Sequence, residues 1–249
     1  MFQILHFSDC HLFAAPNGEI GGVRSADALA ATVTAAQAGA TTSRLAIITG
    51  DLSQDGTPES YERAEQLFAR LGMPVYAVPG NHDRLVCMQT ALTGHPIVWQ
   101  RSVVVAGWQM VFLNSTLTDP DNPAGLLPAE ELSSLEDALL AQPGMPTLVA
   151  LHHQPMPLDT PWMNRMALTN PDDLFTVLAR HPWVRALLFG HIHYPFAGER
   201  QGIHLLSAPS TCVQFATGTT HPVFVTQTAG CRWLRLYPDG HLATGIVWI

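Results

Sequence analysis

Five short segments carry side chains suited to metal binding or proton transfer. They are Asp9-Cys10-His11, Gly50-Asp51, Gly80-Asn81-His82-Asp83, His152-His153 and Gly190-His191-Ile192-His193. Carboxylate oxygens and imidazole nitrogens bind divalent ions, and an imidazole also exchanges protons near neutral pH. One such segment by itself is more often a solvated turn or a helix cap. The repetition of such segments along one chain indicates a metal-binding or catalytic site.

Each segment directly follows an apolar run that predicts a buried β-strand. The predicted strands cover residues 2–7, 45–49, 74–78, 147–151 and 184–189. Continuous apolar runs are typical of parallel strands that are buried on both faces. Because the carboxyl ends of strands in an open α/β sheet line the ligand crevice, we expect side chains from distant parts of the chain to meet there.

The strand ends supply seven candidate metal ligands. They are Asp9, His11, Asp51, Asn81, His152, His191 and His193. Seven ligands are too many for one ion and suit two ions that share a bridging ligand. Oxygen and nitrogen ligands without thiolate favour Mn, Fe, Zn or Co over a calcium cage or a structural zinc site. The alternative is a scatter of buried structural histidines, which does not explain ligands at successive strand ends.

The remaining chain predicts helices between these strands and a β-rich tail. Helices are expected at 25–38, 58–71, 83–92, from 128 onward and at 171–181, and residues 18–24 are expected to form a loop. Strands at 97–99, 103–105 and 108–113 are expected to be neighbours, antiparallel around Ala106-Gly107. The tail carries short strands at 203–207, 223–226, 233–237 and 242–247. Two packed sheets flanked by helices, in one domain spanning residues 1–249, fit this order.

Composition restricts the classes of partner and the location. The formal net charge is -8, only 13% of the 249 residues are charged, and no basic patch is apparent, which disfavours a nucleic-acid polymer as partner. No leader-like segment and no long apolar run are present, so no membrane association is expected. The four cysteines are scattered without disulfide-like spacing. We therefore expect a cytoplasmic protein.

The ordered set of motifs resembles the calcineurin-like metallophosphoesterases, and Gly80-Asn81-His82-Asp83 and Gly190-His191-x-His193 are its most specific parts. The resemblance implies a four-layer α/β/β/α sandwich with a dinuclear metal centre. By the family pattern, one ion is held by Asp9, His11, Asp51 and His193. The second ion is held by the bridging Asp51 with Asn81, His152 and His191.

The same resemblance implies that His82 acts near the phosphate and the leaving group, oriented by Asp83. His153 competes with His152 for the ligand role, and His152 is favoured because it directly follows its strand.

A closer resemblance, to the bacterial class III cyclic-nucleotide phosphodiesterases, covers nearly the whole chain. It includes Ser8 to Phe13, Gly50 to Asp55, His152 to Pro155 and the stretch Leu205 to Phe215. It implies hydrolysis of 3′,5′-cyclic AMP to AMP by a metal-bound hydroxide, with Fe and Mn favoured and Zn or Co as alternatives. Gln154 and Asn114 depart from the pattern at positions that are not metal ligands.

Substrate contacts are expected from Asn81, His82, Trp162 and Thr211. Trp162 belongs to the Pro-rich stretch from Pro155 to Pro171, which equally fits a loop that packs its own small core. Glycerophosphodiesters, 2′,3′-cyclic nucleotides and other phosphodiesters are alternative substrates, because the motifs bind phosphate and not the base. A catalytically silent binding module is the alternative from another class of protein, but it would be expected to have lost ligands. The sequence does not indicate an oligomeric state.

Overall fold

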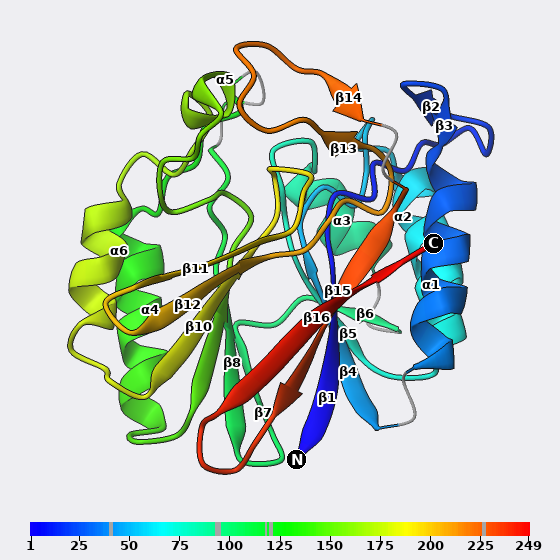
Figure 1. Ribbon diagram of the computed structural model, residues 1–249. Coiled ribbons are helices and arrows are strands. Elements are labelled where there is room, and N and C mark those ends of the chain that lie inside the picture. The colour runs from blue at the N-terminus through cyan, green and yellow to red at the C-terminus, as the bar shows by residue number, and fades with distance from the viewer. Residues whose placement is uncertain (40–41, 93–95, 118, 120–121, 226–227) are drawn as a thin grey trace.

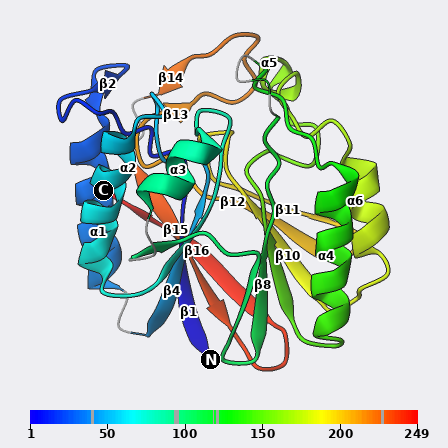
Figure 2. The same cartoon turned by 180° about the vertical axis from the view of Figure 1, so that it is seen from behind.

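The computed structural model places two six-stranded β-sheets face to face, with helices on the outer face of each sheet (Figure 1). It describes residues 1–39, 42–92, 96–117, 119, 122–225 and 228–249. Seen from behind, the same four layers follow one another, with α1 and α2 outside one sheet and α4 and α6 outside the other (Figure 2). The expected α/β/β/α sandwich of two mixed sheets is confirmed.

The first sheet has the order β16-β15-β1-β4-β5-β6. Its parallel strands are β1 (Phe2–Phe7), β4 (Ser43–Thr49), β5 (Val75–Val78) and β6 (Ile97–Val98). The hairpin of β15 (Gly230–Leu236) and β16 (Leu242–Trp248) joins antiparallel to β1. The strands that precede three of the ligand segments are therefore adjacent and point the same way.

The second sheet has the order β11-β12-β10-β9-β8-β7. Its parallel strands are β8 (Trp108–Phe112), β9 (Thr147–Ala150), β10 (Val184–Phe189) and β12 (Ile203–Ser207). The edge strands β7 (Ser102–Val105) and β11 (Phe196–Arg200) pair antiparallel with β8 and β12. The remaining two ligand segments follow β9 and β10, which lie side by side at the centre of this sheet.

Helices cover the outer face of each sheet. The first sheet carries α1 (Ser25–Ala38), α2 (Pro58–Phe68) with a 3-10 turn (Ala69–Leu71), and α3 (Leu85–Ala91). The second carries α4 (Ala129–Ala141) and α6 (Pro171–Leu178). Thr57 begins α2 by accepting a hydrogen bond from the Ser60 amide, and Pro58 occupies the first turn. None of the described helices is long and apolar enough to cross a membrane.

Side-chain alternation along β1 shows how the layers are held together. Phe2 and Ile4 pack into the cluster between the two sheets, whereas Leu5 and Phe7 pack against the outer helices. The ring of Phe7 meets Phe68 of α2 edge-on, with centroids 5.2 Å apart. Because successive side chains of a strand point to opposite faces, an unbroken apolar run is what a strand buried on both faces requires.

Several expected elements differ in the structure. Ile97–Val98 pairs with β5 in the first sheet and is not a neighbour of β7, although β7 and β8 do form the expected hairpin. Residues 18–24 contain a small hairpin, β2 (Glu19–Ile20) and β3 (Val23–Arg24). The helix expected at 58–71 leaves α geometry after Phe68, and Gly72 ends its 3-10 turn in the left-handed region, with φ 65°.

Short elements at the ligand end were also missed from the sequence. The Pro-rich stretch contains α5 (Pro161–Asn164), and β13 (Gln214–Phe215) pairs with β14 (Phe224–Val225). Thr226, expected to end that strand, lies outside the described residues. Both views place β2, α5 and the β13–β14 hairpin at the end of the sandwich where β1 ends (Figures 1 and 2).

Candidate metal centre

The seven candidate ligands converge at the carboxyl ends of β1, β4, β5, β9 and β10. Donor atoms of Asp9, His11 and His193 lie within 4.8 Å of one another, and so do those of Asp9, Asp51 and His152. All seven side chains except the half-buried Asn81 are buried. Two sheets that meet along their faces thus bring together candidate ligands as distant in sequence as Asp9 and His193.

The backbone at five of these residues adopts the left-handed conformation. The φ angles are 54° at Asp9, 48° at His11, 52° at Asp51, 69° at His191 and 58° at His193. The other described non-glycine residues with positive φ are Ala106 and Gln201, each in the turn of a hairpin. Non-glycine residues rarely adopt this conformation, and backbone strain of this kind clusters at functional sites. The ends of these strands therefore have a strained backbone conformation at the residues whose side chains converge.

Two glycines allow the strand ends to approach closely. A Cβ atom added at Gly80 would overlap Asp51, and one added at Gly190 would overlap the side chain of Ser8. Any larger residue at Gly80 would have to displace Asp51, and one at Gly190 would have to displace Ser8, the neighbour of Asp9. Glycine in these two motifs is thus required by the close packing of the ligand loops.

The first group of donors is arranged around two opposed imidazoles. His11 Nε2 and His193 Nε2 lie 2.9 Å apart, although their Nδ1 atoms face oxygen acceptors. His11 Nδ1 is 2.8 Å from Gln54 Oε1, and His193 Nδ1 is 2.8 Å from the Val213 carbonyl. Each ring therefore carries its proton on Nδ1, and two lone pairs face each other. Asp9 Oδ1 lies 3.6 Å from His193 Nε2, so a cation between these atoms resolves the repulsion.

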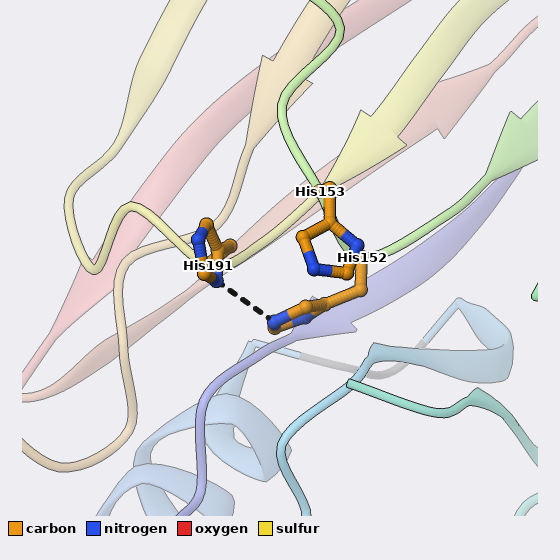
Figure 3. A group of neighbouring side chains, drawn as sticks. All are labelled: His152, His153 and His191. Carbon is orange, nitrogen blue, oxygen red and sulfur yellow. Dashed lines mark hydrogen bonds between the residues drawn. The ribbon is translucent and has the colours of Figure 1, made fainter. Parts of the chain in front are cut away.

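The second group of donors surrounds His152 Nε2. Its ring donates from Nδ1 to the Thr49 carbonyl at 2.7 Å, which leaves Nε2 to face the other donors. That atom lies 3.0 Å from Asn81 Oδ1, 3.4 Å from Asp51 Oδ2 and 3.1 Å from His191 Nδ1. Figure 3 shows His152 and His191 pointing toward each other from neighbouring strand ends. The buried Nε2 of His191 has no hydrogen-bond partner among the residues that the structure describes.

Asp51 lies between the two groups. Its Oδ2 is 3.4 Å from His152 Nε2 and 3.7 Å from His11 Nε2, while its Oδ1 accepts a hydrogen bond from the His82 amide at 2.9 Å. One oxygen is thus fixed by the backbone and the other faces ligands of both groups. This is the position that a bridging carboxylate requires, and the donor set as a whole fits two divalent ions.

Burial and mutual charge set the protonation of the centre. Burial lowers the pKa of His11 to about 3 and that of His193 to about 4. Burial also opposes charge on His152, but the Asp51 carboxylate outweighs it and raises the pKa of His152 to about 9. Burial would raise the pKa of Asp51, but the contact with His152 holds that pKa well below its usual value. Metal-free protein thus keeps an Asp51–His152 ion pair where a cation can replace the proton.

The structure corrects the role expected for Asp83. Its carboxylate accepts hydrogen bonds from the backbone amides of Leu52 at 3.2 Å, Ser53 at 3.0 Å and Gly80 at 2.9 Å. The His82 ring instead meets Gln54, whose Nε2 lies 3.2 Å from His82 Nδ1. Asp83 therefore does not orient the imidazole, because the turn at Gly80 directs its carboxylate toward the loop after β4. It is a positioning residue that ties two ligand loops together.

His153 occupies a different place from its neighbour His152. Its Nδ1 is 2.8 Å from the Ser115 hydroxyl and its Nε2 is 3.1 Å from the Pro123 carbonyl. Both ring nitrogens thus have protein partners, although the ring lies beside the His152–His191 contact (Figure 3), with its centroid 4.9 Å from those of both rings. The geometry favours His152 as the ligand, as the sequence analysis preferred.

A cavity of about 710 Å³ opens above the donors. Asp51, Asn81, His191 and His193 line its floor with His11, and the exposed ring of His82 stands at its side. Trp162 lines the cavity as expected.

Thr211 does not line the cavity, because its side chain is fully buried, so the expected substrate contact through its hydroxyl is wrong. Ser210 and Thr211 instead connect to the loop after β1 through Asp9 and Ser8.

Other lining residues were missed by the sequence analysis. Phe215 and Phe224 stack with centroids 5.5 Å apart, and Phe215 also meets Trp162 edge-on at 5.0 Å and His193 at 4.5 Å. An aromatic wall of Trp162, Phe215 and Phe224 thus rises from a candidate ligand to the cavity mouth. Gln54 lines the cavity next to His82. No periodic pattern marks these positions, because the short segments that carry them meet only in the folded chain.

The comparisons with known proteins agree with this geometry. Residues 2–195 match the family described as calcineurin-like phosphoesterase. A 3′,5′-cyclic-nucleotide phosphodiesterase of Nostoc sp. is 36% identical over 244 residues, which cover 98% of this chain and 91% of the relative. The 3′,5′-cyclic adenosine monophosphate phosphodiesterase CpdA of Pseudomonas aeruginosa is 38% identical over 243 residues, covering 98% and 88%.

Two solved structures show the fold alone. A dimetal phosphatase from Danio rerio has a TM-score of 0.68 at 13% identity, covering 99% of this chain and 98% of that one. GAP50, the anchor in the inner membrane complex of Plasmodium, has the same TM-score of 0.68 at 13% identity and covers 99% and 84%. From the family match and the full-length relatives, the chain belongs to the calcineurin-like phosphoesterases and is similar throughout to 3′,5′-cyclic-nucleotide phosphodiesterases.

Proposed function

We propose that this chain hydrolyses 3′,5′-cyclic AMP to AMP with the help of two divalent metal ions. The observation that carries the proposal is the pair of donor groups joined by Asp51 at the floor of the cavity. The names of the full-length relatives support the substrate. A silent binding module would have no need for seven candidate ligands, five of them held in strained backbone.

The donors divide between the two ions as the family pattern implies. Asp9, His11 and His193 would hold one ion, and Asn81, His152 and His191 the other, with Asp51 shared. When bound, such a pair supplies positive charge to the phosphodiester and an activated hydroxide from water. Fe and Mn are the proposed metals, with Zn or Co as alternatives, because the donors are oxygen and imidazole nitrogen without thiolate.

The aromatic wall of the cavity favours a nucleotide as substrate over a phosphodiester without a base. Trp162, Phe215 and Phe224 offer aromatic faces beside the ligands, and Met163 and Met166 add apolar surface. Aromatic faces stack on nucleobases, and such stacking contributes about 1–3 kcal/mol per base. A planar base can therefore rest on the wall while the cyclic phosphate reaches the donors.

His82 is the proposed donor to the oxygen that leaves phosphorus. Its side chain is exposed in the cavity and lies beside Asp51 and His11, and its ring centroid is 5.0 Å from that of His11. Hydrolysis of a ribose ester creates charge on a poor leaving group, so a positioned N–H there lowers the barrier. Asn81 contributes to the same side of the cavity through its amide.

The partner is proposed to be a small cyclic nucleotide and not a nucleic-acid polymer. Lys and Arg number 12 against 20 Asp and Glu, so the chain offers little charge for tracking a phosphate backbone. The four cysteines are unpaired, which supports a cytoplasmic location.

Turnover of a substrate panel tests the proposal. Metal-stripped protein is reconstituted with Mn²⁺ or Fe²⁺ and given 3′,5′-cyclic AMP, 2′,3′-cyclic AMP or bis(p-nitrophenyl) phosphate at equal concentration. Selective, metal-restored conversion of 3′,5′-cyclic AMP to AMP is expected. Cleavage of the aryl diester with little of either cyclic nucleotide would contradict the substrate but keep the metal chemistry.

A further inference from the structure

Gln54 connects a candidate metal ligand to His82. Its Oε1 lies 2.8 Å from His11 Nδ1, and its Nε2 lies 3.2 Å from His82 Nδ1. The side chain is half-buried and lines the cavity. One amide group thus contacts the side chains of two histidines. In the proposed function, His11 binds a metal ion and His82 donates to the leaving oxygen.

The backbone of Gln54 is held in place by the strand ends. Its amide donates to the Leu12 carbonyl at 2.8 Å, and Leu12 in turn donates to the Leu52 carbonyl at 2.9 Å. Leu12 and Ser53 form a parallel β-bridge immediately beside it. The side chain therefore projects from a fixed point between the loops after β1 and β4.

The metal ligand determines which way the amide faces. An imidazole that binds a cation through Nε2 must carry its proton on Nδ1, and that proton needs an acceptor. For His11 the acceptor is Gln54 Oε1. The amide nitrogen is then turned toward His82, and because it can only donate, His82 Nδ1 must accept.

We propose that Gln54 is a positioning residue that orients the His82 ring, holding Nδ1 as the acceptor of its amide N–H and leaving the N–H at Nε2 to face the substrate. The ring then acts on the substrate as a hydrogen-bond donor to the charge that develops on a phosphoryl or leaving oxygen. The proton stays on the ring, and the leaving oxygen takes its proton from water in the open cavity. This inference rests on the proposed function, because it assumes that His82 faces the phosphodiester.

The amide of Gln54 takes the place beside His82 Nδ1 that the sequence analysis expected Asp83 to fill. The Asp83 carboxylate is engaged by three backbone amides, and the Gln54 Nε2 lies 3.2 Å from His82 Nδ1. A carboxylate oxygen of Asp51 lies within 4.8 Å of a His82 ring nitrogen. Gln54 thus fixes the direction in which the ring faces.

A double-mutant cycle with Gln54→Leu and His82→Ala tests the inference. Leucine nearly preserves the volume of glutamine and removes both hydrogen bonds. We expect Gln54→Leu to lower kcat for 3′,5′-cyclic AMP on the order of tenfold to a hundredfold, with KM little changed. In the His82→Ala background the same change is expected to have almost no further effect, since Gln54 acts through that ring. The exposed Gln100→Leu is the matched control.

Metal content separates this role from support of His11. Gln54→Leu is expected to retain two metal ions per chain. Loss of an ion, or losses in kcat that are independent of His82, would show that Gln54 serves the metal centre and would overturn the inference.

Nitrogen-15 NMR of the Zn²⁺-loaded protein gives a readout that needs no substrate. In the wild type, His82 Nδ1 is expected to show the signal of a nitrogen that accepts a hydrogen bond and Nε2 that of an N–H, and Gln54→Leu is expected to admit the Nδ1–H form. A wild-type His82 whose Nδ1 carries an N–H would overturn the inference. Because this measurement does not depend on turnover, a failure of the proposed substrate would leave it decisive for Gln54.

Discussion

At the residue scale, neighbours in sequence are not always partners in space. The convergence of the seven candidate ligand positions could be predicted because each follows an apolar strand and its chemistry is visible in the residue type. The pairing of Asp83 with His82 could not, because the turn at Gly80 sends one side chain to the cavity and the other to backbone amides. Gln54 was missed since a glutamine in a loop carries no chemical signal until its two histidine partners are placed.

The corrected role of Asp83 gives a prediction for Asp83→Asn. The amide retains one acceptor oxygen and places an NH₂ group against a backbone N–H, so one of three hydrogen bonds is lost. We expect the free energy of unfolding to fall by about 1–3 kcal/mol. Urea unfolding of wild type and variant measures it.

Activity distinguishes this role from direct action on His82. Turnover per metal-loaded Asp83→Asn molecule should fall much less than in His82→Ala. Equal losses of kcat in Asp83→Asn and His82→Ala, with stability unchanged, would restore the expected His82–Asp83 pair.

At the element scale, the long strands and helices could be predicted from the hydrophobic pattern, whereas the short segments above the site could not. The β13–β14 hairpin and α5 have few residues each and no core of their own. Their positions are set by contacts such as the hydrogen bond from Trp162 Nε1 to the Thr219 hydroxyl at 3.2 Å. Ile97–Val98 was assigned to the wrong sheet because two apolar residues do not specify a neighbour.

The aromatic wall predicts that Phe224→Ala impairs binding of the base. The ring is 47% exposed in the free protein, so its removal should leave the fold intact. We expect kcat/KM for 3′,5′-cyclic AMP to fall about tenfold, in line with the loss of one stacking contact. A cyclic ribose phosphate without a base should be cleaved at the same rate by wild type and variant.

Val223→Ala is the matched control, because Val223 is a neighbouring exposed residue that does not line the cavity. Equal losses with both substrates would place the base elsewhere in the cavity.

Strand β1 carries a pH-sensitive group away from the ligands. His6 is fully buried, with Nε2 2.8 Å from the Thr49 hydroxyl, and burial together with Arg232 holds its pKa well below the usual value. The folded chain keeps this ring neutral, whereas the unfolded chain protonates it below about pH 6.5. Stability contributed by this difference is therefore present above that pH and is lost as pH falls.

Denaturant unfolding of metal-free protein at pH 7 and pH 5 measures the effect. His6→Gln has no titrating ring, so its loss of stability between these pH values should be about 2 kcal/mol smaller than that of wild type. The same pH dependence in both proteins would show that His6 is protonated in the folded state.

At the scale of the whole molecule, two sheets packed face to face make one candidate site from residues far apart in sequence. Arg232 of β15 donates to the carbonyls of Ser207 and Phe196 in the other sheet, so the sheets are tied by hydrogen bonds as well as by apolar packing. The sandwich could be predicted from the resemblance and the strand order. The single domain spanning residues 1–249 stays a prediction, to be tested by whether unfolding is one cooperative transition.

The fold by itself does not decide function, since it is shared with a dimetal phosphatase and with an anchor protein. The proposed function therefore rests on the site of this chain: opposed imidazole nitrogens at 2.9 Å, a carboxylate facing both groups, and a cavity with an aromatic wall.

The most direct test of this account is a Mn²⁺ titration of metal-stripped protein, with metal bound and 3′,5′-cyclic AMP turnover measured in the same samples. We predict that AMP formation rises until two ions are bound per chain and then stays constant. Saturation of turnover at one bound ion, or no AMP formed with two ions bound, would contradict it.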